Sequence, residues 1–407
     1  MGTDNYQWDI IEKLSFTRPA GSDECRRACD IIRDEVRKLG GETVLEAFSF
    51  EHFKIDRAVL RVTEPYEREY EATGIGFSGN ISGDFPFKYV ERATKYDLPE
   101  DFDGAAMINE YNREQYGAIK NSKVAVFIAP SGKFYADRNS TDLTQSKLGR
   151  KMRDMDGEPT PGFLIRSADA IEMVKSGASR VHCELAQHSE ILECENIISI
   201  IPGESRPDEY FTFSAHYDSV DVGVGAYDNA TGVAALLWLY RYFTKHRPQR
   251  SLVFIWCCAE ERGLLGSLDY VSRHPEINGR TKAEINFDLT GPAIGYDGVS
   301  VAAAESVCEY VRGFADGRAH SFVVNKHAAS SDSTSFAEAG IPSFNFYRYG
   351  QADIHNRFDV LFPLFDKTLD KTTSFVRDFI LAIDKPTIPF DTKMPDDMAE
   401  EVRKYLH

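Results

Sequence analysis

The stretch that decides the fold is YFTFSAHYD, residues 210–218. Its apolar and aromatic side chains are typical of a buried strand, and the stretch closes on the polar residues His216 and Asp218. Similar short runs rich in Val, Ile and Phe recur in the second half of the chain, at residues 195–201, 251–259, 283–288 and 341–347. Helical stretches such as residues 232–245 lie between them. This alternation predicts an α/β domain with a mixed, mainly parallel sheet flanked by helices.

Residues with acid–base or metal-binding side chains follow the strands of this predicted sheet. In chain order they are His216 and Asp218, Glu260 and Glu261, Asp288, and His355. Another carboxylate, Asp228, stands just before the long apolar helix. Ligands of open α/β sheets bind beyond the carboxyl ends of the strands. We therefore expect these side chains to meet at one edge of the sheet.

Each of these residues has an ordinary explanation when it is taken alone. Asp228 before a helix suits an N-cap, and adjacent Glu260 and Glu261 suit a solvated surface pair. Those explanations do not account for the fact that these residues follow successive strands of the same predicted sheet. Several carboxylates packed together repel each other and stay ionised only beside positive charge. We therefore interpret the cluster as a site for metal cations.

Histidine, aspartate and glutamate together suit zinc or a related divalent cation. The number of candidate ligands favours two metal ions about 3.5–4 Å apart that share one carboxylate. Such a pair lowers the pKa of bound water to about 7 and polarises a carbonyl group, which is the chemistry of amide hydrolysis. Because Glu260 and Glu261 are adjacent in a loop, one can bind metal while the other takes a proton from the attacking water.

The charge of the chain argues against a polyanionic partner. Its 407 residues contain 47 Lys and Arg and 64 Asp and Glu, which gives a formal net charge of −17. Such a protein would approach nucleic acid or an anionic membrane against its own mean field, so we expect neither as a partner. No apolar run is long enough to span a bilayer. The composition makes no prediction of the oligomeric state.

The compartment is inferred from the first residues and from the cysteines. The start, MGTDNYQWDI, has no basic segment followed by an apolar one, so no signal peptide is visible. Seven cysteines, an odd number without a CxxC pair, are typical of buried free thiols in a reducing environment. We therefore expect a cytoplasmic protein, or a secreted one if a leader has been removed.

The length predicts more than one domain, since a single core rarely grows past about 300 residues. Residues 56–188 are rich in turn residues and short β-prone runs, which indicates a smaller β-rich domain inserted into the chain. The strands and helices of the α/β pattern then belong to a discontinuous catalytic domain, residues 1–55 and 189–407.

The motifs around the candidate residues resemble peptidase family M28, the co-catalytic zinc aminopeptidases and carboxypeptidases. The matching stretches are Ser214–Ser219, Tyr227–Gly232, Ala259–Ser267, Ile285–Gly291, Ser331-Asp332 and His355 with Asp359, together with Arg18 and Gly21-Ser22 near the start. The region between residues 56 and 188 is similar in position to the protease-associated domain that some members insert. That resemblance implies an insert that shapes substrate access and adds no chemistry.

The resemblance also implies a role for each candidate residue. The implied ligands are His216 and Asp288 for one zinc ion, Glu261 and His355 for the other, and Asp228 between both. Glu260 would be the general base. Asp218 would orient His216, a role that also follows from how carboxylates support metal-bound imidazoles.

Two positions depart from the family pattern. Asn356 follows the last histidine, where the family usually has Thr or Ser, and Ser333 follows Ser331-Asp332, where the family often has His. Neither departure removes an implied ligand. Both are expected to alter the substrate pocket.

The leading hypothesis is a dizinc exopeptidase acting on peptides, most simply an aminopeptidase, because a free amine suits an acidic site. A carboxypeptidase or dipeptidase of the same family would need a cationic clamp for the terminal carboxylate, for which Arg348 and Arg357 are the candidates. A glutaminyl cyclase-like acyltransferase would use a single zinc ion. A non-catalytic binding protein ranks low, because all five implied ligands and Glu260 are present.

Overall fold

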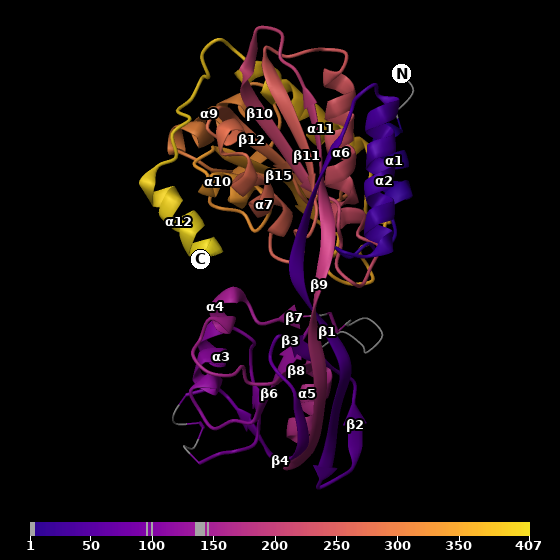
Figure 1. Ribbon diagram of the computed structural model, residues 1–407, viewed down its shortest axis with the longest axis vertical. Helices are drawn as coiled ribbons and strands as arrows, with labels where there is room; N and C mark the ends of the chain where they lie inside the picture. The colour runs from indigo at the N-terminus through magenta and orange to yellow at the C-terminus, as the bar shows by residue number, and fades with distance from the viewer. Residues whose placement is uncertain (1–4, 95–96, 99–100, 135–142, 145) are drawn as a thin grey trace. The chain divides into compact units, whose positions relative to one another are not determined.

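The structure is a computed structural model that describes residues 5–94, 97–98, 101–134, 143–144 and 146–407 (Figure 1). It divides into two compact units. Unit 1 comprises the chain up to Phe50 together with Glu193–Leu406, and unit 2 comprises Glu51–Leu192. The borders expected from the sequence were residues 56 and 188. Two long strands, β1 (Val44–Glu64) and β9 (Arg180–Ile201), run across the borders of the units, so no turn marks the division.

Unit 1 is built on a sheet with the strand order β14-β13-β15-β12-β10-β11-β9. Its strands after β9 are β10 (Arg206–His216), β11 (Arg250–Cys257), β12 (Thr281–Phe287), β13 (Gly295–Ala302), β14 (Phe322–Lys326) and β15 (Ser343–Gly350). The four central strands β11, β10, β12 and β15 are parallel, whereas β9 and β13 pair antiparallel with β11 and β15. The prediction of a mixed, mainly parallel sheet is confirmed.

The central strands are apolar on both faces because helices cover both sides of the sheet. All eight residues of β11 are buried. Val253, Ile255 and Cys257 share a cluster with α7 (Leu265–Arg273) and α10 (Ser333–Glu338) on one face. The alternate residue Phe254 faces the other way and meets Tyr240 of α6 (Thr231–Phe243) at a ring distance of 5.0 Å.

Helix α6 is the centre of the second helical layer. Ten of its thirteen residues are buried, so it is apolar nearly all round, as expected of a helix enclosed by other elements. The helices packed against it are α1 (Tyr6–Leu14), α2 (Asp23–Lys38) and α11 (Asp366–Ile383), as Figure 1 shows. Helix α9 (Glu305–Asp316) joins this layer through Phe314, which packs edge-on against Phe375 and Phe379 of α11. Two short helices complete the unit, α8 (Pro275–Asn278) and α12 (Asp396–Leu406).

The register of the parallel strands brings their carboxyl ends to one level. His216, the last residue of β10, pairs with Cys257, the last residue of β11. Two residues earlier, Ser214 pairs with Asn286 near the end of β12, and Asn286 pairs with Asn345 of β15. Residues that directly follow these strands therefore emerge at the same edge of the sheet.

Unit 2 has a sheet and an apolar core of its own. Its strand order is β4-β5-β6-β8-β3-β7, and β1 and β2 form an antiparallel pair beside it. The strands after β1 are β2 (Arg68–Tyr70), β3 (Ala72–Gly76), β4 (Ile81–Val90), β5 (Ala105–Ile108), β6 (Val126–Ser131), β7 (Ser146–Lys147) and β8 (Gly162–Arg166), with helices α3 (Arg113–Lys120), α4 (Arg150–Arg153) and α5 (Ser167–Lys175). Two successive residues of β6, Phe127 and Ile128, belong to two different apolar clusters. None of the candidate site residues lies in this unit.

A buried ion cluster joins β13, β15 and α11 of unit 1. The carboxylate of Asp297 is inaccessible to solvent and lies 3.0 Å from Arg348 Nη1, 2.8 Å from His320 Nε2 and 2.9 Å from Lys371 Nζ. Burial by itself would raise the pKa of Asp297, but hydrogen bonds from His320, Lys371 and Arg348 outweigh it and lower that pKa.

We predict that Asp297→Asn lowers the free energy of unfolding by about 3–5 kcal/mol, because Arg348 is left buried without its partner charge. Urea unfolding at pH 7 measures this loss, with the exposed Asp316→Asn as the control. Since the folded-state pKa lies below the unfolded one, the contribution is present above about pH 4 and disappears as the pH falls through the folded pKa. Equal stability of the two variants at pH 7 would contradict the prediction.

Candidate metal centre

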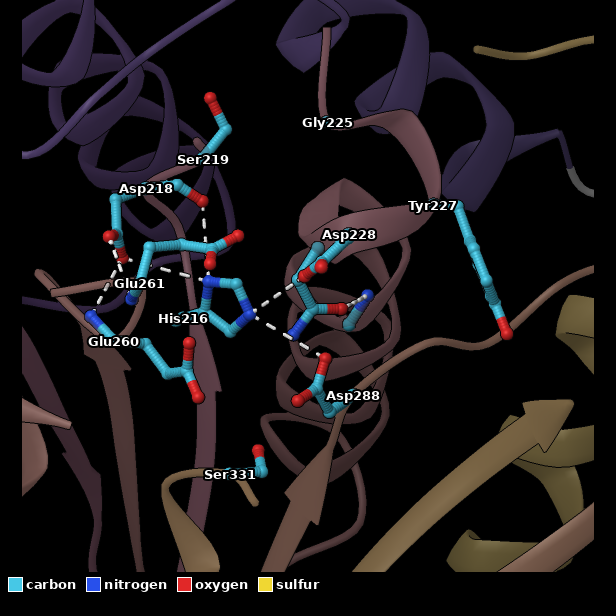
Figure 2. Close-up of polar contacts among 12 residues, drawn as sticks. His216, Asp218, Ser219, Gly225, Tyr227, Asp228, Glu260, Glu261, Asp288 and Ser331 are labelled. Carbon is cyan, nitrogen blue, oxygen red and sulfur yellow. Dashed lines mark hydrogen bonds and ion pairs between the residues drawn. The ribbon is translucent and has the colours of Figure 1, made fainter. Parts of the chain in front are cut away.

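The structure brings the residues singled out from the sequence together at the carboxyl edge of the unit 1 sheet (Figure 2). His216 ends β10, Asp218 follows it, Glu260 and Glu261 follow β11, Asp288 follows β12, and His355 lies in the loop after β15. Asp228 lies in the kinked segment Ala226–Ala230, whose backbone is non-helical at Asp228 and Asn229, just before α6. Burial of the cluster is high: among these residues only His355 is substantially exposed.

Asp228 is the centre of the arrangement. One carboxylate oxygen, Oδ1, lies 3.1 Å from His216 Nε2, and the other, Oδ2, lies 3.1 Å from His355 Nε2. Asp288 Oδ1 approaches His216 Nε2 at 3.5 Å, while Glu261 Oε2 approaches His355 Nε2 at 3.3 Å. The side chains thus form two groups of three that share Asp228, and within each group the ligand atoms lie within 4.8 Å of one another.

The donor atoms of this cluster fit divalent cations. Within the described part of the chain, His216 Nε2, Glu261 Oε1 and Asp288 Oδ1 are buried and make no hydrogen bond. A buried polar atom without a partner costs about 1–3 kcal/mol, so native structures rarely leave several of them in one place. Imidazole nitrogens and carboxylate oxygens are zinc ligands, and a bound cation would satisfy all three atoms.

Electrostatics also point to a cation site. Burial opposes protonation of His216, but the surrounding carboxylates, Glu260 first among them, outweigh it and raise its pKa well above the usual value. Hydrogen bonds to Asp228 and Glu261 raise the pKa of His355 to about 11. Burial would raise the pKa of Asp228, but the two imidazoles reverse the effect and lower it. Protons on the imidazoles therefore balance the carboxylates when no cation is bound.

Glu260 differs from the other carboxylates because it makes no ion pair in the described part of the chain. Figure 2 shows its carboxylate beside His216 and on the same side of the cluster as Asp288. Burial raises the pKa of Glu260 well above its usual value, and the negative charges of Asp288 and Glu261 raise it further against the opposing effect of His216. A carboxyl group with a raised pKa is suited to accept and return a proton.

Asp218 connects His216 to the turn that carries the two glutamates. Its Oδ1 lies 3.6 Å from His216 Nδ1, and its main-chain carbonyl oxygen lies 3.3 Å from the same nitrogen. The backbone N–H groups of Glu260 and Glu261 donate to its two carboxylate oxygens at 3.2 and 3.3 Å. One buried carboxylate therefore positions three of the candidate side chains.

The structural role of Arg18 was missed by sequence reasoning, which recorded only its place in a motif. Its guanidinium is fully buried and donates to five main-chain carbonyl groups, those of Tyr217, Leu14, Phe16, Val224 and Gly225, at 2.6–3.2 Å. Three of these carbonyls belong to the segment that leads from Tyr217 to the turn of Asp228. Arg18 thus holds that segment in place. A lone arginine among apolar residues before the first motif was the available signal.

Asp359 holds the backbone on which Asp228 stands, and sequence reasoning noted it without assigning this role. Its carboxylate accepts from the N–H groups of Tyr227 at 2.7 Å and Asp228 at 3.1 Å. Burial raises the pKa of Asp359 to about 7. Asn229, the residue after Asp228, follows a cis peptide bond. Its side chain donates to the Phe287 carbonyl at the end of β12 at 2.8 Å. The candidate bridging residue is therefore fixed from both sides.

A cavity of about 320 Å³ opens beside Asp288. Its lining is polar and aromatic and includes no lysine or arginine; the residues are Tyr227, Asp288, Leu289, Tyr296, Ser300, Asn325, His327, Ala329, Ser330, Asn345, Tyr347 and Tyr349. Part of this surface is one rung of the sheet, where Asn325, Ser300 and Asn345 pair across β14, β13 and β15. The sequence placed no pocket here, because these residues meet only through strand pairing.

Of the two arginines considered as a carboxylate clamp, Arg348 is already engaged. It donates from Nε to the Pro292 carbonyl at 2.7 Å and from Nη1 to Asp297 at 3.0 Å. Arg357 is exposed and stays a candidate. Asn356, which departs from the family pattern, closes the turn after His355 by donating to the Ile354 carbonyl at 2.9 Å. Ser333, the other departure, is buried at the start of α10.

Comparison with known proteins gives one family. The model of peptidase family M28 matches residues 196–380. The Vacuolar membrane protease of Saccharomyces cerevisiae (strain ATCC 204508 / S288c) is 40% identical over 99 residues, which are 24% of this chain and 10% of that protein. Aminopeptidase YwaD of Bacillus subtilis (strain 168) is 28% identical over 250 residues, 59% of this chain and 52% of that protein. The chain thus spans only part of the length of these relatives.

Solved structures share the fold. BSAP, a zinc aminopeptidase from Bacillus subtilis, superposes with a TM-score of 0.78 at 20% identity, covering 97% of this chain and 98% of that one. The aminopeptidase from Aneurinibacillus sp. strain AM-1 superposes with a TM-score of 0.74 at 21% identity, covering 97% and 98%. The likeness extends over nearly the whole chain.

The expectation of a cytoplasmic protein is corrected by these comparisons. The S. cerevisiae relative is named for the vacuolar membrane, so related sequence also occurs outside the cytoplasm. The seven cysteines of this chain are all free and buried, and a buried thiol reports packing rather than compartment. None of the described helices is long and apolar enough to cross a membrane.

The family model covers every residue of the candidate centre, from His216 to His355. It also covers the four parallel strands β10, β11, β12 and β15, whose ends carry these residues. Sequence motifs, sheet topology and the paired side-chain groups around Asp228 lead to the same assignment. Residues 196–380, which carry the candidate centre, match peptidase family M28.

Proposed function

We propose that the protein is a dizinc exopeptidase that hydrolyses peptide bonds and releases N-terminal residues. The observation that carries this proposal is the position of Asp228, whose two carboxylate oxygens each face a different imidazole at 3.1 Å. A carboxylate with a histidine on either side is what a bridging ligand between two cations requires. Each of the two side-chain groups that share Asp228 contains three possible ligands, which favours a pair of ions over a single one.

In this proposal His216 and Asp288 hold one zinc ion, Glu261 and His355 hold the other, and Asp228 contributes an oxygen to each. Bound there, the two ions would supply a water of lowered pKa and polarise the peptide carbonyl. The residues themselves supply position and charge. The three ligand carboxylates, beside two neutral imidazoles, would offset three of the four positive charges of two divalent cations, and none of the ligands would remain without a partner.

Glu260 acts as general base and then as general acid. It takes a proton from the attacking water and returns it to the leaving amine, a task that suits a buried carboxyl group of raised pKa. Asp218 is a positioning residue: it orients the His216 ring through Nδ1 and fixes the backbone of Glu260 through a 3.2 Å hydrogen bond.

The surroundings favour a free amine over a free carboxylate at the bound end of the peptide. The cavity next to Asp288 has no lysine or arginine in its lining, and Arg348 is bound to Asp297. A carboxypeptidase would depend on Arg357 alone for its clamp. A glutaminyl cyclase-like enzyme with one zinc ion would leave one of the two ligand groups without a purpose.

We propose further that unit 2 is an inserted domain of the protease-associated type. It is compact, has two apolar clusters of its own, and contributes none of the candidate residues. Its contribution would be to substrate access.

We predict that amino-acid amides with a free amine are hydrolysed and that N-blocked dipeptides are not. A chromogenic screen of both series, with N-terminal glutaminyl peptides included, measures the choice. Turnover of the blocked dipeptides alone would contradict the aminopeptidase proposal. Cyclisation of N-terminal Gln without hydrolysis would support the single-zinc alternative.

We predict that Glu260→Gln keeps both zinc ions and lowers kcat by about 10²–10⁴-fold, because the amide isostere cannot take the proton. Steady-state kinetics together with zinc analysis by mass spectrometry provide the test. Glu309→Gln, on the exposed face of α9, is the matched control and should leave both quantities unchanged. Wild-type activity in Glu260→Gln would overturn the assignment of the base.

We predict that the metal-free protein takes up two zinc ions per chain and releases protons as it does so. Proton release follows because His355, whose pKa is raised to about 11 by its carboxylate neighbours, must lose a proton to bind metal. Calorimetry at pH 7 in buffers of different ionisation enthalpy counts the protons. Asp228→Asn should weaken both sites, since both depend on this residue. Saturation at one zinc ion per chain would contradict the proposal.

A further inference from the structure

Helix α12 packs beside α10 at the side of unit 1 (Figure 1). Its apolar contact is small: Met398 and Val402 are buried against Ala302 and Ala337. Three polar contacts of the helix are directed to one short segment of the chain, residues 326–330.

These polar contacts follow a regular pattern. Asp397 pairs with Lys326 Nζ at 2.8 Å, Glu401 Oε1 accepts from the backbone N–H of Ala328 at 2.9 Å, and the hydroxyl of Tyr405 contacts the hydroxyl of Ser330. The three helical positions are four residues apart, which is about 6 Å along a helix. Their partners are two residues apart, which is about 6.6 Å along an extended chain. The helix therefore runs alongside the segment in register.

The same segment is a wall of the cavity beside Asp288. His327, Ala329 and Ser330 line that cavity. The residue that follows, Ser331, accepts a hydrogen bond from the Asn286 side chain at 2.7 Å, and so anchors the segment to β12. Residues 326–330 therefore lie between the cavity and α12.

Tyr405 contacts the cavity wall through the hydroxyl of Ser330, which lines the cavity. Burial raises the pKa of its phenol, the Ser330 hydroxyl lowers it, and the negative charge of Glu260 raises it again. The residue is 45% exposed, so it lies between solvent and the cavity wall.

We propose that α12 is part of the substrate site, where it clamps residues 326–330 as a cavity wall and makes Tyr405 a specificity-determining residue. This rests on the proposed peptidase function. The substrates concerned are peptides whose first side chain is bulky and uncharged, because the cavity is lined mainly by tyrosine, asparagine and serine and by no lysine or arginine, and because its carboxylate, Asp288, is assigned to the metal. A small first side chain would not reach the cavity wall, so binding of such a substrate would not depend on α12.

The test compares alanine and phenylalanine amide substrates in the full-length protein. In the double variant Glu401→Ala/Tyr405→Phe, which removes two of the three polar contacts, KM for the phenylalanine substrate should rise by about tenfold. KM for the alanine substrate and the zinc content should stay within about twofold of wild type. Glu400→Ala, on the exposed face of the helix, is the matched control and should change neither substrate. An equal effect on both substrates, or no effect on either, would overturn the proposal.

Hydrogen exchange separates this proposal from the proposed function. Since Glu401 accepts from the Ala328 N–H, Glu401→Ala should speed amide exchange in the peptide that contains residues 326–330 and leave the strand β11 peptide unchanged. That readout needs no turnover. Unchanged exchange at residues 326–330 would overturn the clamp even in an active enzyme, whereas faster exchange in a protein that hydrolyses no peptide would refute the peptidase function alone.

Discussion

The structure depends on the concentration of buried negative charge around two imidazoles. Asp228 lies between His216 and His355, and Asp288 and Glu261 approach the same Nε2 atoms of these two rings. Like charges at these distances cannot all persist in a buried site unless positive charge is present. Protons on the imidazoles meet that need in the metal-free protein, and divalent cations meet it better because they also satisfy the buried ligand atoms that lack hydrogen bonds.

Much of unit 1 serves to keep these charges in place. Arg18 holds the segment before Asp228 through main-chain carbonyls, Asp359 holds the two N–H groups at the Asp228 turn, and Asp218 ties His216 to the glutamate turn. Each is buried, and each acts on the backbone as well as on charge. Such supporting contacts reduce the freedom of the ligands, which a site with fixed metal distances requires.

In the proposed function, the substrate cavity takes in elements that carry none of the candidate ligands. Most of the candidate ligands follow the ends of parallel strands, whereas the cavity beside Asp288 also includes residues of β13, β14 and β15 and of the segment 326–330. Helix α12 backs that last segment. Selectivity can therefore vary through the cavity wall while the carboxyl edge of the sheet keeps its ligands.

The α/β class and the candidate ligands could be predicted from local sequence order, in which an apolar run is followed by a polar residue at its end. His216, Asp288 and the other candidate ligands could be predicted in this way. Three features could be recognised only in the tertiary structure. They are the hydrogen bonds of Arg18 to the segment before Asp228, the cavity between β13, β14 and β15, and the contact of Tyr405 with Ser330. Each joins residues that are far apart in the chain, through strand register or helix packing, and no local pattern encodes such distances.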